Sequence, residues 1–418
     1  MRLQPDRAFF MGISCIWAIF ITGISLVYAE NARPTPNSPI ETEASASADQ
    51  LRLSDSAPAA VESESGQASE AGDVQERGVL PNAVRPGLIP QVMAPLQPAP
   101  LSISALPGHF AIQTFGMKYL TAVGGGGRVT DVFHTDAAAI GAWERYRLFL
   151  VLGGGSPPKF AIQTAGFNFI TAVNGGGQSG PAGGTDAVHT DAKQVQSWET
   201  FRFALDEKGW RHAIQTANGH YLSAVGAGGK TTDAIHTDAV KVDNWESFYI
   251  WKCGDLGSGR HYTIRAVSDP HGFVFAYDGG GRVNTRDGNF IFGALGVLND
   301  YRNRPASFDN RWQQFLFMRQ NDGSYALRTS NGANYVTALK GGGQASGGIT
   351  WDNLVTDRTQ VQAWEKFRFI EHGSCTYVIQ TASGHYLGKK TATTGIGKFA
   401  TNVSDINQAT KFRLGVLF

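Results

Sequence analysis

Several features are scarce in this chain of 418 residues, and each shortage argues against a class of protein. Three Cys are too few for a disulfide-dense miniprotein, and 17% charged residues lie below the roughly 25% of an average globular protein. Lys and Arg are scattered and the formal net charge is +1, which argues against a nucleic-acid-binding protein. Beyond the first 29 residues no stretch has the spacing of an amphipathic helix, which argues against a coiled coil.

Glycine, in contrast, is abundant. The chain contains 51 Gly, a share well above the usual one, and this predicts many turns and an all-β architecture. At a typical domain size of roughly 100–200 residues, the length allows two or three domains.

The N-terminal segment predicts export. Two arginines among the first seven residues precede an uncharged run of 22 residues, 8–29. A basic start, an apolar run and a small final residue are typical of a signal peptide, residues 1–29, cut after Ala29. The run is also long enough to span a bilayer, so the alternative is an uncleaved anchor formed by residues 8–29. In both cases we expect a secreted, periplasmic or cell-surface protein.

Residues 30–107 predict a disordered tether. Eleven of the 17 Pro lie between Pro34 and Pro107, and residues 30–77 carry ten acidic and three basic side chains without an aromatic. Such a stretch buries too little apolar surface to offset the entropy of an ordered chain. Its Pro content makes it semi-extended. The remainder of the chain carries a net charge of about +6.

From residue 108 onward the sequence repeats itself six times. Each copy begins with a short alternating segment of the type Ile-Gln-Thr, and its central aliphatic residue marks the copy. These residues are Ile112, Ile162, Ile214, Ile264, Leu327 and Ile379, at intervals of 50, 52, 50, 63 and 52.

The order of residues within a copy is that of β-structure. The first strand is followed by a turn such as Asn218-Gly219, a second strand, a glycine cluster and then Trp-Glu-x-aromatic. The tryptophans of this last motif and of a related Trp-Gln are Trp143, Trp198, Trp245, Trp364 and Trp312.

Units of about 50 residues with roughly four short strands build propeller blades or trefoil lobes. Copies one to three resemble each other more than they resemble copies four to six, and a Gly-rich joint at residues 253–259 separates the two sets. The sixth copy also ends flush with the chain. We therefore predict two tandem β-trefoils, at residues 108–256 and 257–418, rather than one six-bladed ring.

The repeated pattern Ile-Gln-Thr-x-Gly-x-Tyr-Leu-x-Ala-Val-x-Gly-Gly, closed by Trp-Glu-x-Phe, resembles the fascin-like (actin-crosslinking-like) β-trefoil family. The resemblance covers residues 108–418. It implies barrels of six two-stranded hairpins with threefold pseudosymmetry, and filament bundling as a family activity. Fascins proper carry four trefoils and are cytoplasmic, whereas two trefoils and an export segment are expected here.

A His-Thr-Asp triplet lies at the same place in each of the first three copies. The triplets are His134-Thr135-Asp136, His189-Thr190-Asp191 and His236-Thr237-Asp238. They could form turns in which Thr and Asp bond nearby backbone groups. They could instead line three equivalent glycan pockets, or bring three histidines together as ligands of zinc.

A second acidic residue lies five positions before each of these aspartates, at Asp131, Asp186 and Asp233. Two carboxylates per copy are what glycoside hydrolysis requires. A catalytic pair, however, is normally unique to one cleft, and threefold repetition favours folding or multivalent binding. We therefore expect no enzyme activity, no cofactor and no resident metal.

The repeated tryptophans are expected in the core, because they recur with the period of the copies and precede a strand aromatic. Trp210 and Trp351 break the repeat and are the candidates for an exposed platform on which a sugar stacks. Cys253 and Cys375 are the cysteines outside the leader, and in an exported protein they could form one disulfide or remain buried thiols.

Together these features predict an exported, non-catalytic binding protein for a glycan or polysaccharide, acting through several weak sites at once. The alternative is a filament-bundling or adhesion protein with a filament or surface protein as partner. Glycoside hydrolysis is the third interpretation. Nucleic acid is not an expected partner, and a membrane is expected only through an uncleaved N-terminal segment.

Overall fold

The computed structural model describes residues 99–418 except 207–208, 269–271, 283–284, 288–289, 293–294, 299–308, 345–352 and 391–395. The described residues belong to one compact unit, Pro90–Phe418. The predicted leader and nearly all of the predicted tether lie outside them. Within the described part, no helix combines the length and the apolar character that a membrane span requires.

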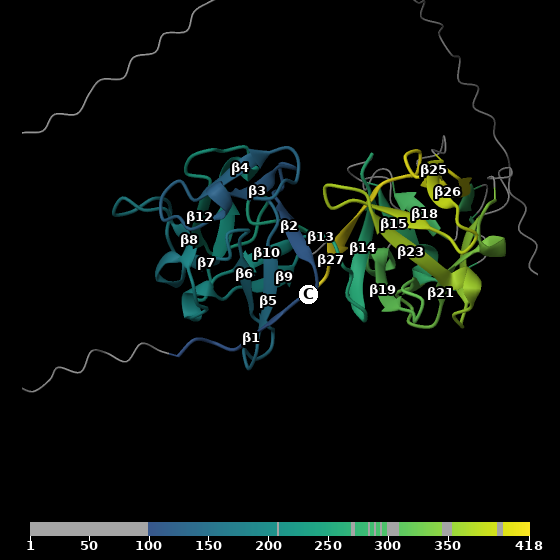
Figure 1. Cartoon of the computed structure of the whole chain (residues 1–418), viewed down its shortest axis with the longest axis horizontal. Helices are drawn as coiled ribbons and strands as arrows, with labels where there is room; N and C mark the ends of the chain where they lie inside the picture. Colours follow the sequence, from purple (N-terminus) through teal and green to yellow (C-terminus); the bar gives the residue numbers. More distant parts are fainter. Residues whose placement is uncertain are drawn as a thin grey trace, which may run out of the picture. The chain divides into compact units, whose positions relative to one another are not determined.

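The described residues form an all-β structure, which confirms the fold class predicted from the composition (Figure 1). Helical elements in this part are 3-10 turns of three or four residues. Each of the six copies contributes four main strands. The first and fourth belong to a barrel, and the second and third form a hairpin at one end of it.

Copies one to three build the first barrel. Its six strands are β2 (His109–Gln113), β5 (Arg147–Val151), β6 (Phe160–Gln163), β9 (Arg202–Leu205), β10 (His212–Gln215) and β13 (Tyr249–Cys253). Antiparallel pairing of β5 with β6, β9 with β10 and β13 with β2 makes half of the ring. Bridges between the copy-opening and copy-closing aromatic positions, such as Phe110–Tyr146 and Phe160–Phe201, make the other half. The ring of six strands is therefore closed.

Copies four to six build the second barrel in the same way. Its six strands are β14 (Arg260–Ala266), β19 (Gln314–Arg319), β20 (Tyr325–Arg328), β23 (Lys366–Glu371), β24 (Tyr377–Gln380) and β27 (Phe412–Val416). Each strand pairs with the next, and β27 returns to β14.

Most of the remaining strands form the cap hairpins, one for each copy. They are β3 (Tyr119–Ala122) with β4 (Phe133–Ala137), β7 (Phe169–Ala172) with β8 (Val188–Ala192), β11 (Tyr221–Ala224) with β12 (Ile235–Ala239), β15 (Phe273–Ala276) with β18 (Leu295–Leu298), β21 (Tyr335–Ala338) with β22 (Leu354–Arg358), and β25 (Tyr386–Lys390) with β26 (Ile396–Val403). Outside this scheme, β1 (Ile103–Ala105) pairs with β5, and β16 (Thr285–Asp287) with β17 (Phe290–Phe292). A four-strand unit repeated three times around each closed barrel is consistent with β-trefoils.

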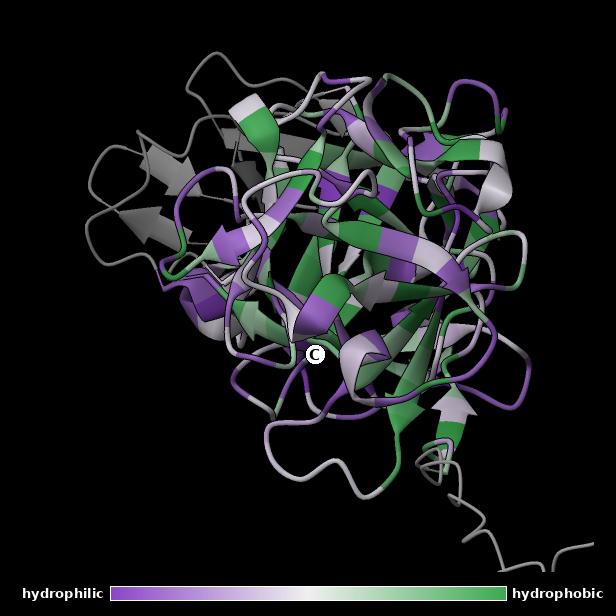
Figure 2. Cartoon of the chain, turned by 90° about the vertical axis from the view of Figure 1, so that its left-hand side faces the viewer, coloured by the Kyte–Doolittle hydropathy of each residue, from purple (hydrophilic) through white to green (hydrophobic). Residues whose placement is uncertain are grey.

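The repeated sequence positions account for the core. The central aliphatic residue of every copy is at most 3% exposed, and so is the closing aromatic. The closing aromatics are Tyr146, Phe201, Phe248, Phe315, Phe367 and Phe412. In Figure 2, hydrophobic residues accordingly lie along the barrel strands at the centre of the view.

The glycine clusters lie where successive copies meet. Gly126 has a φ of +100° and Gly228 a φ of +106°. A Cβ atom on Gly126 would fall on the side chain of Thr164, and one on Gly228 would fall on Thr114. Both threonines close the Ile-Gln-Thr segment of another copy. The glycine cluster of one copy and the threonine of the Ile-Gln-Thr segment in another copy thus form one contact between copies.

The two barrels share strand pairing and one covalent link. Strand β13 of the first barrel pairs with β27 of the second at Trp251 and Gly415. Cys253 and Cys375 form a disulfide. The ring of Phe418 also packs among aromatic residues of the first barrel, 4.6 Å from the ring centre of Phe203. The predicted boundary at residue 256 lies in the segment between β13 and β14.

Candidate functional site

The His-Thr-Asp triplets lie on the third strand of each copy in the first barrel, β4, β8 and β12. Their threonines are fully buried. Each threonine Oγ1 accepts a backbone N–H from a neighbouring copy: Thr135 from Lys230 at 3.1 Å, Thr190 from Arg128 at 3.2 Å and Thr237 from Gln178 at 3.1 Å. Thr356 and Thr401 make the equivalent bonds in the second barrel. The central residue of the triplet therefore joins copies to one another.

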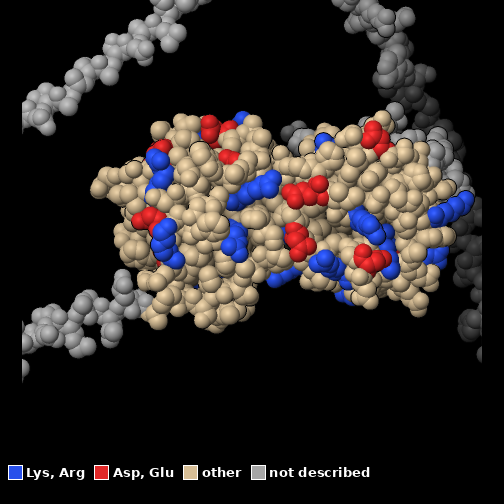
Figure 3. Space-filling view, viewed as in Figure 1, with Lys and Arg blue, Asp and Glu red and all other residues tan. Residues whose placement is uncertain are grey.

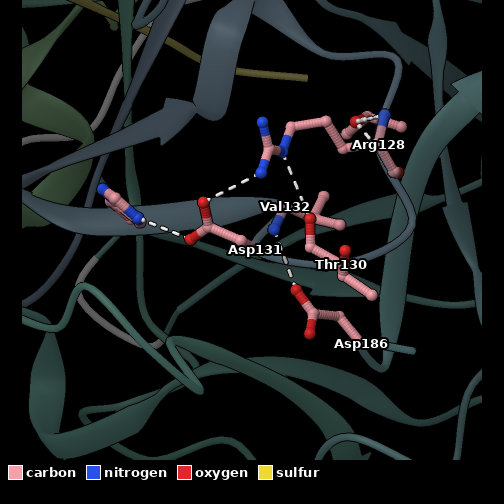
Figure 4. Close-up of polar contacts among 7 residues, drawn as sticks. Arg128, Thr130, Asp131, Val132 and Asp186 are labelled. Carbon is pink, nitrogen blue, oxygen red and sulfur yellow. Dashed lines mark hydrogen bonds and ion pairs between the residues drawn. The ribbon is translucent and has the colours of Figure 1, made fainter. Parts of the chain in front are cut away.

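Two of the three histidines bond the preceding aspartate. His134 Nε2 lies 2.8 Å from Asp131 Oδ1, and His236 Nε2 lies 2.8 Å from Asp233 Oδ1. Arg128 also pairs with Asp131, at 3.0 Å (Figure 4). The first and third copies thus share one local His–Asp bond, whereas the predicted turn, in which Thr and Asp of the triplet bond nearby backbone groups, is not found in the described part of the chain.

The second copy departs from this arrangement. Its stretch from Gly177 to Asp186 spans nine positions, whereas the equivalent stretch in copies one and three spans four. Asp186 Oδ2 accepts the backbone N–H of Val132 in the first copy, at 2.8 Å (Figure 4). The Nε2 atom of His189 is buried, without a hydrogen-bond partner among the described residues. The longer turn therefore breaks the threefold equivalence of the triplets.

The space between the three cap hairpins is too small for a ligand. A cavity lined by Val132, Asp186 and Asp233, among others, has a volume of about 10 Å³, which is room for about one water molecule. The described residues contain no group of three or more His, Cys, Asp or Glu side chains that could hold a metal ion. The interpretation of the histidines as joint zinc ligands is therefore wrong for this part of the chain.

The aspartates of the triplets remain available for binding. Asp136, Asp191 and Asp238 are exposed. They make no hydrogen bond or ion pair with the residues that the structure describes. Their partners in the proposed carboxylate pairs are in contrast occupied, two by histidine and one by a backbone amide.

The Trp-Glu motif forms a rigid turn that the sequence did not predict. Each glutamate is 3–7% exposed, at Glu144, Glu199, Glu246 and Glu365. One carboxylate oxygen accepts the hydroxyl of the second strand, for example from Thr171 to Glu199 at 2.8 Å. The other accepts a backbone N–H at the start of the turn, from Gln196 at 2.8 Å. The same two bonds recur at Glu144, Glu246 and Glu365.

The tryptophans of this turn face solvent, and the prediction that they lie in the core is wrong. Trp143 and Trp245 are 49% exposed, Trp198 is 44% exposed and Trp364 is 43% exposed. The glutamate bonds inward and the aromatic two residues beyond it enters the barrel, so the tryptophan is left on the outer side of the turn. Trp312, in the fourth copy, is half-buried and lies 5.5 Å from the Tyr277 ring.

Of the two residues expected to form exposed platforms, Trp210 is buried. It is 6% exposed and stacks on Phe273 at 4.7 Å, so a residue of the first barrel packs on one of the second. The prediction of an exposed Trp210 is therefore wrong. Trp210 has no counterpart in the other copies because it makes a contact between the two barrels. Trp351 lies outside the described residues.

Shallow grooves lie beside the Trp-Glu turns. One, of about 460 Å³, is lined by His109, Arg145, Arg147, Thr164 and Phe167 together with the turn residues 141–142. Another, of about 490 Å³, is lined by Lys366, Arg368 and Thr381 among others. A third, of about 450 Å³, includes Trp364 itself. On the face shown in Figure 3, Lys and Arg lie in small separate groups rather than in one large patch.

Comparisons with known proteins leave the family open. No family model matches the chain, and no curated protein matches it. Similar solved structures include a designed threefold-symmetric protein, ThreeFoil, with 13% identity, a TM-score of 0.28 and coverage of 38% of this chain and 99% of that one. An endo-β-galactosidase from Clostridium perfringens that releases GlcNAcα1-4Gal has 11% identity, a TM-score of 0.27 and coverage of 76% and 73%.

A mosquitocidal holotoxin has 8% identity, a TM-score of 0.29 and coverage of 74% of this chain; the match spans about a third of the toxin's length, 34%. At these TM-scores and identities the likeness carries no argument about function. The resemblance to the fascin-like family stays a prediction.

Proposed function

We propose that this chain is an exported, non-catalytic protein of two tandem β-trefoils that binds carbohydrate at several equivalent sites. The observation that carries the proposal is the exposure of the same tryptophan in four copies. An indole ring with about half of its surface in water is a flat apolar face, and Trp combines such a face with a polar N–H donor. Because the buried glutamate fixes each turn, these faces are preorganised for stacking on sugar rings.

Repetition supports a multivalent mode of binding. Shallow sites bind weakly one at a time, but linked sites raise the effective concentration for each other. A polysaccharide repeats its sugar unit and can therefore occupy several turns at once. The disulfide between Cys253 and Cys375 supports export, since such bonds persist in oxidising compartments.

The bonding of the carboxylates supports a non-catalytic role. Glycoside hydrolysis uses two carboxyl groups that act on one bond. In each of the first three copies one member of the pair is hydrogen-bonded within the fold, which leaves one aspartate per copy without a partner among the described residues. A single carboxylate in each of three separate places fits binding better than catalysis.

The proposal is tested by binding of the full chain to a panel of insoluble and soluble polysaccharides. We expect binding that the triple variant Trp143→Ala, Trp198→Ala, Trp245→Ala loses by about 100-fold or more, since avidity falls when linked sites are removed together. These side chains are exposed, so the melting temperature should hardly change. The triple variant Asp136→Asn, Asp191→Asn, Asp238→Asn serves as the matched control and should retain binding.

Loss of binding in the aspartate variant alone would place the sites at the His-Thr-Asp triplets instead. Absence of binding to every polysaccharide would contradict the proposal. The next assay would then be co-sedimentation with actin filaments, because exposed Trp and Arg are also the residues most enriched at the centres of protein interfaces.

A further inference from the structure

The same groove occurs between two copies in each barrel. In the first barrel it lies between copies one and two, and in the second between copies five and six. Arg145 and Arg147 follow Trp143 by two and four positions, and Lys366 and Arg368 follow Trp364 by the same numbers. Each groove therefore has two basic residues on one wall and the first hairpin of the next copy on the other.

The groove of the first barrel, which we name the Arg145 groove, is cationic and has no acidic residue in its lining. Arg145 is half-buried, and its Nε atom is buried without a hydrogen-bond partner in the described part of the chain. Arg147 donates to Gln163 Oε1 at 3.3 Å and lies 5.0 Å from the Phe149 ring. The guanidinium of Arg147 is thus held against Gln163 and Phe149, and that of Arg145 makes no hydrogen bond or ion pair with the described residues, so both keep unused donors.

The local electrostatics agree with this description. Burial lowers the pKa of His109 below its usual value, and the positive charges of Lys252, Arg147 and Arg145 lower it further. His109 is accordingly neutral at pH 7, and the charge of the groove comes from the two arginines.

A strained aromatic residue faces the arginines. Phe167 is 67% exposed and has a φ of +62°, in the left-handed region that bulky residues avoid. Glycines occupy the equivalent hairpin position in three other copies, at Gly219, Gly332 and Gly384. Copy one also carries a side chain at this position, Met117 with a φ of +64°, but Met117 packs against the core, whereas Phe167 is exposed in the lining of the groove.

The second groove lacks these features. Lys366 forms an ion pair of 3.2 Å with Asp322, and Asp322 also lines this groove. Gly384 occupies the position that Phe167 has in the Arg145 groove. In the second groove the charge of Lys366 is therefore neutralised by Asp322, and no aromatic residue is among the described residues that line the groove. It provides a matched control within the same chain.

We propose that the Arg145 groove binds an anionic sugar of a polysaccharide, one that carries a carboxylate or a sulfate group. Guanidinium groups bind such planar or tetrahedral oxyanions through paired hydrogen bonds, and Phe167 offers a face for the sugar ring. The net charge of about +6 from residue 108 onward attracts a polyanion from solution. This inference rests on the proposed carbohydrate-binding function and names the class of carbohydrate.

The test is a titration of the full chain with polygalacturonate, dextran sulfate, neutral dextran and polyglutamate. We expect binding to one or both anionic polysaccharides, which weakens as salt screens the charges. Arg145→Gln with Arg147→Gln should lower this affinity by about tenfold or more. Lys366→Gln with Arg368→Gln should leave it within about twofold, as expected of exposed or already paired charges.

Phe167→Gly separates binding from folding. It should lower the affinity for the anionic polysaccharide without lowering the melting temperature, since glycine relieves the backbone strain at this position. A purely structural Phe167 would instead give a less stable protein with unchanged affinity, and that result would overturn the inference.

Three other results would also overturn it. They are binding of neutral dextran as tight as that of the better-bound anionic polysaccharide, binding of polyglutamate as tight as that of the same polysaccharide, and full affinity for it in the Arg145→Gln, Arg147→Gln variant. Each of these leaves the carbohydrate-binding function intact if neutral polysaccharides still bind through the tryptophans. Failure of the proposed function itself is recognised by the absence of binding to all polysaccharides.

Discussion

At the position where copies one and two carry Phe110 and Phe160, copy three carries His212. The imidazole is fully buried, and both ring nitrogens are without hydrogen-bond partners among the described residues. Its neighbours are the rings of Phe203 and Phe418, at 6.1 and 5.4 Å. Burial lowers the pKa of His212 to about 3. The residue is thus a neutral polar group in an aromatic environment.

We expect His212→Phe to stabilise the protein, and more so in acid. In the unfolded chain the imidazole binds a proton below about pH 6.5, whereas in the folded protein it stays neutral down to about pH 3. Between these values the unfolded state binds more protons than the folded state. His212 therefore lowers the free energy of unfolding by about 1.4 kcal/mol for each unit by which the pH falls below about 6.5. Melting temperatures of both proteins between pH 4 and 8 check this. Parallel curves for the two proteins would contradict it.

Individual residues also show where sequence reasoning reaches its limit. The repeat correctly marked Trp143 and Glu144 as equivalent positions in several copies. It did not show which of the two side chains faces inward. The repeat period shows that a position recurs in several copies, but it does not show whether the side chain there points toward the core or toward solvent. A buried carboxylate beside an exposed indole is the reverse of the usual preference of these residues, and only the bonds to Thr121 and Gly141 explain it.

At the scale of single elements, the Trp-Glu turn of copies one, two, three and five holds the second strand to the closing strand. Without the carboxylate, a buried hydroxyl and a partly buried backbone N–H would lose their partner. Unmade hydrogen bonds of this kind cost about 1–3 kcal/mol for each group. The turn therefore contributes to stability and positions the exposed tryptophan at the same time.

Glu199→Ala should accordingly lower the free energy of unfolding by about 2–4 kcal/mol, because Thr171 and the amide of Gln196 are left unpaired. Denaturant unfolding gives this value. The matched control is Trp198→Ala in the same turn, which removes an exposed side chain and should change it by less than about 0.5 kcal/mol. Equal effects of the two substitutions would show that the carboxylate has no special role.

The cap hairpins give a second lesson at this scale. The His-Thr-Asp triplets were recognisable in the sequence, but their interpretation as turns is wrong, because the triplets lie on strands and Thr135 and Thr237 bond backbone groups of another copy. The bonds between copies could not be inferred, since the partner of each threonine is distant in the sequence. The longer turn of copy two, visible in the sequence, moves Asp186 to the amide of Val132.

At the scale of the whole molecule, the two barrels are joined by a disulfide between residues 122 positions apart. Its neighbour Lys252 is almost fully buried, and its Nζ donates to the carbonyl of Cys253 at 3.2 Å. Burial lowers the pKa of Lys252 to about 8, while Asp255 and Glu371 act in the opposite direction.

Replacing both cysteines, with Cys253→Ser and Cys375→Ser, should lower stability by about 2–4 kcal/mol, because the closed loop no longer limits the unfolded chain. Thermal unfolding of the oxidised protein and of the double variant measures the difference. Reduction of the unaltered protein should give the same decrease as the variant. An unchanged melting temperature in both would mean that strand pairing alone holds the barrels together.

The sequence supported the large-scale organisation better than the surface. Six repeats, an all-β fold and a joint near residue 253 followed from spacing and glycine content, which depend on local geometry. The burial of Trp210 did not, because it depends on a contact with Phe273 of the other barrel. Neither did the Arg145 groove, whose walls come from two copies and whose arginines are unremarkable in a single repeat.

The central claim is that the exposed tryptophans bind carbohydrate, and Trp fluorescence of the full chain during titration with polysaccharides tests it most directly. We expect a saturable change in intensity or emission maximum with at least one polysaccharide, which is lost in the variant that replaces all four exposed tryptophans, Trp143→Ala, Trp198→Ala, Trp245→Ala and Trp364→Ala. A saturable change that persists in this variant, or binding detected by calorimetry with no change in fluorescence, would contradict the claim.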